Sequence, residues 1–217
     1  MTASPVGIVA VPGLGLDARS FARVMGRVPA TVVLLPGMGL PELCPSVDQL
    51  AGVLLDRLGT GPVVLVGHSQ SCQVVVAAAQ AGGHRIDAVV LLGPTTDPRL
   101  RTLPVLARRW LRTAVREPWW QVPLILAQWW RTGPRSMVRL WRTAAPDRID
   151  RRLRELDVPV TVVRGTRDAL CPRDWARHLT AASPLGRLVE IPGAAHMTVQ
   201  SHPDPVAAII RAAAAGR

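Results

Sequence analysis

Short apolar runs alternate with segments of helical periodicity along most of the chain. Six runs rich in Val, Ile and Leu predict buried strands, at residues 6–11, 31–35, 63–66, 86–92, 158–163 and 188–191. The segments between them space apolar residues three or four positions apart, which predicts helices, at residues 17–27, 46–58, 71–79, 172–182 and 204–214. Strands that alternate with helices favour an α/β domain, and we expect a mostly parallel sheet of about six strands with helices on both faces.

The alternation is interrupted between residues 99 and 154. This segment holds six of the seven Trp residues and many Arg, and Pro residues divide it into short pieces that we expect to be helical. We therefore expect residues 1–98 and 155–217 to form the core, and residues 99–154 to form a helical cap over the sheet edge.

The Trp residues of this cap have three interpretations. They could pack the cap onto the sheet while Arg faces solvent, or they could line an apolar pocket. Docking at a membrane interface is the third, which we disfavour because the Pro spacing leaves no long amphipathic helix.

Composition restricts the partners. A chain of 217 residues with 48% hydrophobic and 19% charged residues is typical of one globular domain. The formal charge of +11 would normally indicate nucleic acid, but every basic residue is Arg. Because Arg, Ala, Pro and Gly are abundant together, as in GC-rich genomes, we expect no nucleic-acid partner. No apolar run approaches the ~18 residues of a transmembrane helix, so we expect no stable membrane insertion.

A cytoplasmic location and the absence of cofactors are also expected. Cys44, Cys72 and Cys171 are widely spaced, which fits reduced thiols better than disulfides or a metal site. Met1–Pro5 lacks the basic residues that precede the apolar core of a signal peptide. Gly13-x-Gly15 is only a fragment of a dinucleotide fingerprint, so neither an organic cofactor nor a metal is expected. The oligomeric state is left open.

The clearest chemical signal is Gly67-His68-Ser69-Gln70-Ser71, between a predicted strand and an Ala/Val-rich helix. Small residues at both ends of this pentapeptide allow a sharp strand-to-helix turn with Ser69 at its apex. A Ser hydroxyl needs a base within hydrogen-bond reach and a group that orients the base. His196 and Asp168 follow the last two predicted strands, and the carboxyl ends of parallel strands share one sheet edge. We therefore expect all three side chains at that edge.

The pentapeptide resembles the nucleophile elbow of the α/β-hydrolase superfamily, Gly-x-Ser-x-Gly, with Ser71 in place of the last Gly. The chain order Ser69, Asp168, His196 is also similar to that of the family, and the resemblance covers nearly the whole chain. It implies that these three residues form a catalytic triad. The sheet would start at the first parallel strand, without the antiparallel hairpin that precedes it in the family.

Pro12-Gly13-Leu14 looks like the His-Gly-x segment of the same family, with Pro12 in place of His. The resemblance implies an oxyanion hole formed by the backbone N–H groups of Leu14 and Gln70. The implied function is a serine hydrolase that cleaves a carboxylic ester or thioester through an acyl-enzyme. Its partner would be a small-molecule substrate with an apolar acyl or ring-shaped group. An acyltransferase or C–C bond hydrolase with the same triad is an alternative, and so is a non-catalytic binding protein with this fold.

Each proposed partner of Ser69 has a rival interpretation. Asp168 could instead pair with Arg167, and Asp97 follows the fourth strand, where some family members place the acid. We expect Ser71 to point away from the apex of the turn. Structural or surface roles are expected for the other histidines, His68, His84, His178 and His202.

Overall fold

The computed structural model describes residues 6–42, 45–100 and 102–216, so the predictions for Met1–Pro5 and Cys44 lie outside the described residues. Six strands form one sheet in the order β2-β1-β5-β6-β7-β8, and all neighbouring strands are parallel. They are β1 (Gly7–Val11), β2 (Thr31–Val32), β5 (Val63–His68), β6 (Ile86–Leu92), β7 (Val160–Gly165) and β8 (Gly186–Ile191). The predicted fold class is confirmed.

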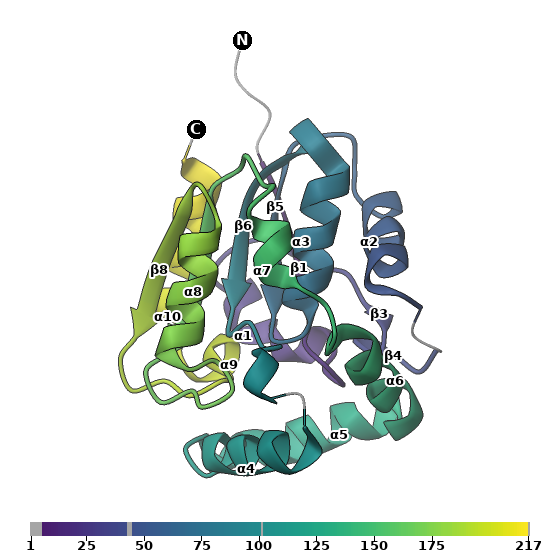
Figure 1. Ribbon diagram of the computed structural model, residues 1–217, viewed down its shortest axis with the longest axis vertical. Helices are drawn as coiled ribbons and strands as arrows, with labels where there is room; N and C mark the ends of the chain where they lie inside the picture. The colour runs from purple at the N-terminus through teal and green to yellow at the C-terminus, as the bar shows by residue number, and fades with distance from the viewer. Residues whose placement is uncertain (1–5, 43–44, 101, 217) are drawn as a thin grey trace.

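Helices cover both faces of the sheet (Figure 1). One face packs against α2 (Val47–Asp56), α3 (Ser71–Gly82), α7 (Ile149–Leu153) and α8 (Arg173–Ala182). The other packs against α1 (Ala22–Met25), α9 (Thr198–Ser201) and α10 (Pro203–Ala215). Successive strand residues alternate between the two cores, as Val64 and Leu65 do in β5. Burial on both faces explains why these strands are continuous apolar runs.

Helix α2 begins where the sequence predicts. The Ser46 side chain accepts a hydrogen bond from the Gln49 backbone N–H at 3.2 Å, and the Gln49 side chain accepts one from the Ser46 N–H at 3.0 Å. This capping box satisfies two backbone donors that the first turn leaves free.

Two predicted elements are wrong in extent. The helix expected over 17–27 is a 3₁₀ turn, η1 (Ala18–Ser20), followed by the short α1. Asp17 caps the start of this turn, since its carboxylate accepts from the Arg19 N–H. The N–H groups of Ser20 and Phe21 then bond to carbonyls three residues back, which is 3₁₀ and not α geometry. The strand expected over 31–35 ends as β2 at Val32.

Beyond Val32 the chain turns away from the sheet. Gly37 has a φ of +75°, and this turn folds β3 (Leu35–Pro36) onto β4 (Gly39–Leu40) in a separate two-stranded sheet. Pro36-Gly37, which was expected to close the strand over 31–35, instead lies at the turn between β3 and β4.

The cap consists of short helices at the carboxyl ends of the strands (Figure 1). They are η3 (Pro98–Leu100), α4 (Leu103–Ala114), η4 (Trp119–Gln121), α5 (Val122–Thr132) and α6 (Pro134–Ala144). Helices α4, α5 and α6 each have Pro in their first two positions, where the missing N–H costs nothing. None of the described helices is long and apolar enough to cross a membrane.

The domain boundaries stay a prediction. Helix α7, inside the predicted cap, packs against α3 and α8, and its Ile149 and Leu153 are buried in the core. This packing supports ending the cap before Ile149.

Candidate active site

The turn after β5 is strained in the way the pentapeptide predicts. Ser69 has a φ of +58°, a left-handed conformation that non-glycine residues rarely adopt. A Cβ on Gly67 would lie 2.7 Å from Val75 Cγ2 and 3.0 Å from Cys72 Cα, so only glycine lets β5 and α3 approach this closely. The half-buried Ser69 side chain is thereby held at the carboxyl end of the central strand.

Ser71 stabilises the same turn. Its hydroxyl accepts a hydrogen bond from the His68 backbone N–H at 2.8 Å and donates one to the Val11 carbonyl at 2.7 Å. It therefore points away from the apex, as predicted, and joins the ends of β5 and β1. These two bonds give a physical reason for Ser where the family pattern has Gly.

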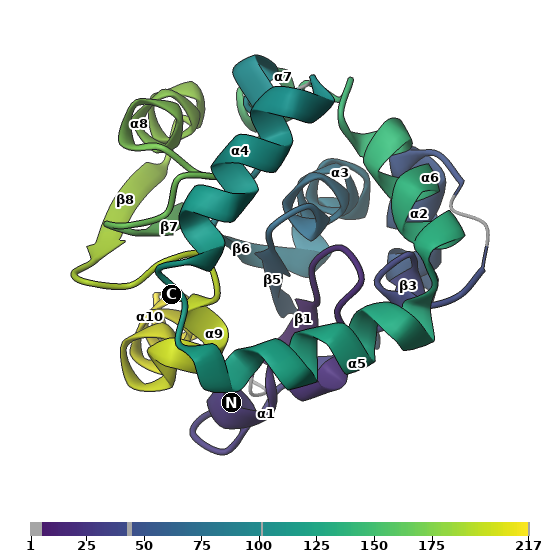
Figure 2. The ribbon, with the colours of Figure 1, turned by 90° about the horizontal axis from the view of Figure 1, so that it is seen from below.

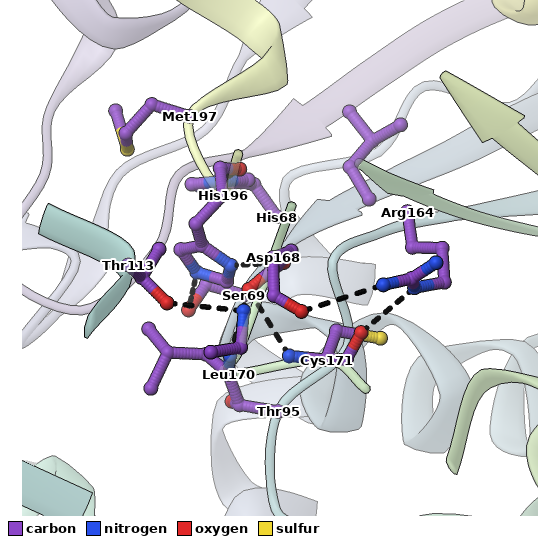
Figure 3. Close-up of polar contacts among 12 residues, drawn as sticks. His68, Ser69, Thr95, Thr113, Arg164, Asp168, Leu170, Cys171, His196 and Met197 are labelled. Carbon is purple, nitrogen blue, oxygen red and sulfur yellow. Dashed lines mark hydrogen bonds and ion pairs between the residues drawn. The ribbon is translucent and has the colours of Figure 1, made fainter. Parts of the chain in front are cut away.

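The structure brings together the three side chains that the sequence singled out (Figure 3). Ser69 Oγ lies 2.9 Å from His196 Nε2, and His196 Nδ1 lies 2.7 Å from Asp168 Oδ2. With the proton on Nδ1, His196 donates to Asp168 and its Nε2 accepts from the Ser69 hydroxyl.

Asp168 is held in place by the loop that carries it. Its Oδ1 accepts from the backbone N–H groups of Leu170 and Cys171 at 2.8 and 3.1 Å. Burial alone would raise the pKa of this carboxyl, but His196 and the two backbone donors hold the pKa below its usual value. Burial likewise opposes a positive charge on His196, yet the Asp168 carboxylate raises the pKa of His196 above that of a free imidazole.

Asp97, the alternative candidate for the acid of the triad, is bound by another residue. Asp97 forms an ion pair with Arg99 at 2.6 Å and accepts from the Arg99 backbone N–H. His196 instead faces Asp168, and no described contact joins Asp168 to the exposed side chain of Arg167. His202 lies outside the cluster, with its Nδ1 2.9 Å from the Ser201 hydroxyl.

Two neighbours of His196 on the core side complete its surroundings. His68 is fully buried with Nε2 3.2 Å from the His196 carbonyl, and burial, aided by the nearby His196, lowers the pKa of His68 to about 3. It therefore stays neutral and holds the backbone of the His196 loop. Gly93, after β6, has a φ of +57°, and a Cβ there would lie 3.0 Å from His196 Nδ1. Because Gly93 has no side chain, there is room for the imidazole of His196.

Glu117, in the cap, was missed by the sequence interpretation. Its Oε1 accepts a hydrogen bond from the Met197 backbone N–H at 2.7 Å, and its buried Oε2 has no partner among the described residues. Burial raises the pKa of Glu117, whose charge in turn helps to raise the pKa of His196. The available signal was that Glu117 is the only acidic residue between Arg99 and Pro146.

A cavity of about 600 Å³ lies between the cap and the sheet edge, and Ser69 and His196 are part of its wall. Three cap Trp residues, Trp110, Trp129 and Trp141, line it, and the rings of Trp110 and Trp129 are 5.7 Å apart. Leu14 and Gln70 line it too. No acceptor among the described residues binds the backbone N–H groups of these two residues.

The part of the chain that the structure describes offers little support for metal binding or thiol chemistry. No group of three or more His, Cys, Asp or Glu side chains there could hold a metal ion. Cys72 and Cys171 are free and fully buried, and burial raises the pKa of both thiols. They are thus poor nucleophiles at neutral pH.

Comparison with solved structures agrees with the architecture. The chain is similar to a thermophilic esterase, at 20% identity and a TM-score of 0.79, with 96% of this chain and 89% of that one covered. A hydrolase from Oleispira antarctica gives 12% identity and a TM-score of 0.80, covering 99% and 93%. MenH from S. aureus is 17% identical, with a TM-score of 0.78, and 99% of this chain and 96% of that one are covered. At these identities the likeness shows the fold alone.

Comparison by sequence identifies the family. No curated protein matches the chain by sequence. A model of the alpha/beta hydrolase family matches residues 8–209, from the first strand to the last helix. The protein therefore belongs to the alpha/beta hydrolase family.

Proposed function

We propose that the protein is a serine hydrolase that cleaves a carboxylic ester or thioester through an acyl-enzyme intermediate. One observation carries the proposal: the continuous hydrogen-bonded path from Ser69 Oγ through His196 to Asp168, at the wall of an apolar cavity. The strained φ of Ser69 supports it, because such strain persists mainly where function requires it.

The proposed reaction starts at Ser69. His196 Nε2 takes the hydroxyl proton while Oγ attacks the substrate carbonyl, and Asp168 stabilises the resulting imidazolium. The free backbone N–H groups of Leu14 and Gln70 then donate to the oxyanion. Collapse of this tetrahedral intermediate expels an alcohol or thiol, which takes the proton from His196. Water, deprotonated by His196, attacks the acyl-enzyme and releases the acid.

The cavity supports an apolar acyl group or ring as the part of the substrate that is bound. Leu106, Ile125 and Trp129 line it together with other apolar cap residues, and a volume of about 600 Å³ suits a small molecule. The likeness to a thermophilic esterase agrees with this choice of chemistry.

A fluorophosphonate probe tests the proposal, because it forms a bond only with an activated serine. We expect one probe per wild-type chain by intact-protein mass spectrometry and none on Ser69→Ala. Ser183→Ala is the matched control, since the buried Ser183 hydroxyl has no partner among the described residues, and it should label fully. Unlabelled wild type, or equal labelling of Ser69→Ala, would refute the proposal. A series of p-nitrophenyl esters and acyl thioesters would then define chain length and leaving group.

The charge of Glu117 is expected to set where activity falls at low pH. Glu117→Gln keeps an acceptor for the Met197 N–H but removes a negative charge that raises the pKa of His196. Since His196 must be neutral to act as a base, the acidic limb of kcat/KM should move to lower pH in this variant. Glu155→Gln, at an exposed residue just beyond α7, should leave the limb in place. A limb that does not move in Glu117→Gln would show that the Glu117 charge does not act on the base.

A further inference from the structure

Exposed apolar side chains are concentrated on the cap. Of the twelve large hydrophobic residues that are exposed in the described part of the chain, ten lie between Val105 and Val138. Trp119 and Trp130 are 83% and 87% exposed, although Trp is usually well buried in soluble domains. Single exposed apolar residues are ordinary, but such a concentration marks an interaction surface.

Three of these residues lie on one side of α5. Val122, Leu126 and Trp130 are exposed at four-residue intervals, which places them on one side of the helix, and Trp119 precedes them. We call Trp119, Val122, Leu126 and Trp130 the apolar ridge. No exposed position from Trp119 to Trp130 is charged.

Exposed arginines lie on the helices that precede and follow the ridge. Helix α4 contributes the exposed Arg108 and Arg112, and α6 contributes Arg135, Arg139 and Arg142. Figure 2 shows α4 and α6 extending from the two ends of α5. None of these five arginines forms an ion pair with another described residue.

The distribution of charge separates the cap from the rest of the protein. Residues 99–148, the cap without α7, contain 11 of the 26 basic residues and 2 of the 15 acidic ones, so their formal charge is +9. The remainder carries only +2. A genome-wide preference for Arg would raise the number of basic residues everywhere, so it does not explain this asymmetry.

The Pro spacing argues against membrane docking, but the exposed ridge on α5 reverses that expectation. We propose that the outer surface of the cap docks on a lipid membrane that contains anionic phospholipids. The ridge would enter the interface while the arginines of α4 and α6 bind anionic headgroups, which supplies the two contributions that peripheral binding needs. A second copy of the chain is a poor occupant, because two caps of +9 repel each other. Nucleic acid would use the arginines but leaves the aliphatic part of the ridge without a partner.

The ridge and the cavity share residues. Val122 and Leu126 of the ridge, and Trp110 of α4, are exposed and also line the cavity that contains Ser69. An apolar ester dissolved in the membrane could therefore reach the cavity through the docked surface. This last step rests on the proposed function, whereas docking itself does not.

Vesicle flotation tests the docking. Wild-type protein should bind vesicles of phosphatidylcholine with phosphatidylglycerol more tightly than vesicles of phosphatidylcholine alone, and added salt should weaken the binding. Arg112→Gln/Arg139→Gln should lower the partition coefficient about 30-fold, because each Arg near an anionic surface contributes about fivefold. Trp119→Ser/Trp130→Ser should lower it on the order of tenfold, from lost apolar burial.

Matched variants on the core serve as controls. Arg177→Gln/Arg187→Gln removes two exposed charges, and Leu185→Ser removes an exposed apolar side chain; neither should change vesicle binding. The proposal fails if the wild type does not bind anionic vesicles at low salt, or if the core variants weaken binding as much as the cap variants. Binding of duplex DNA or RNA in preference to vesicles would overturn it, as would a dimer in sedimentation that Trp119→Ser/Trp130→Ser dissociates. Fluorophosphonate labelling measures the reactivity of Ser69 separately, so a failure of docking can be told apart from a failure of the proposed function.

Discussion

His196→Ala is expected to lower kcat for a p-nitrophenyl ester by about 10⁶-fold, the size of effect seen when the base of a serine-protease triad is removed. The structure supplies the reason. Nε2 of His196 is the nitrogen 2.9 Å from Ser69 Oγ, and the structure shows no other hydrogen-bond partner for that hydroxyl among the described residues. Without the imidazole, Ser69 would have to lose its proton to water, at a pKa far above neutrality.

His202→Ala is the matched control, because His202 is six residues further along and bonds to the Ser201 hydroxyl instead. It should keep nearly full activity. Burial of Asp168 without its partner could also destabilise His196→Ala, so His196→Gln is the second variant, and both should be shown by circular dichroism to be folded. A folded variant that retains most of the wild-type kcat would contradict the proposed role of His196.

Asp168→Asn is expected to lower kcat by about 10⁴-fold, as the same change does in a serine-protease triad. The size of the side chain is unchanged, so the loss comes from charge and hydrogen bonding. The Asp168 carboxylate accepts from His196 Nδ1 and raises the pKa of His196. An amide can instead donate to Nδ1 and favour the tautomer with the proton on Nε2, where it cannot accept from Ser69.

Asp97→Asn decides between the two candidate acids. Asp97 follows the neighbouring strand and is also buried, but its carboxylate is taken up by Arg99. We expect Asp97→Asn to affect the melting temperature more than kcat, and Asp168→Asn to show the reverse pattern. A large loss of kcat in Asp97→Asn with an active Asp168→Asn would assign the acid to Asp97. The measurement is kcat per folded enzyme, calibrated by active-site titration of the wild type.

Much of the fold could be predicted because its signals are local. A parallel strand buried on both faces must be an apolar run, as Val63–His68 is, and a helix start such as Ser46 carries its own capping residues. Predictions failed where the first turn is a 3₁₀ helix, at Ala18–Ser20, or where a turn redirects the chain, at Gly37. Both depend on contacts that periodicity does not encode.

The candidate site divides in the same way. Ser69, Asp168 and His196 could be named because each follows a strand, and parallel topology alone delivers their loops to one edge. Glu117 could not be named from the sequence, because its proximity to His196 depends on how the cap folds back over the sheet. Gly93 is the same case: its need to be glycine arises from the imidazole of a residue over a hundred positions away.

By itself, the sequence determined the alternation of strands and helices, the identity of the nucleophile candidate and the total charge of +11. Only the tertiary structure decided which Trp residues of the cap line the cavity and which, like Trp119 and Trp130, are exposed to solvent. The physical reason is that periodicity records whether a residue faces a neighbouring element, but not whether that face is covered. Whether an apolar face is covered by another element depends on how the whole chain packs. That packing distinguishes a buried core from an exposed apolar surface.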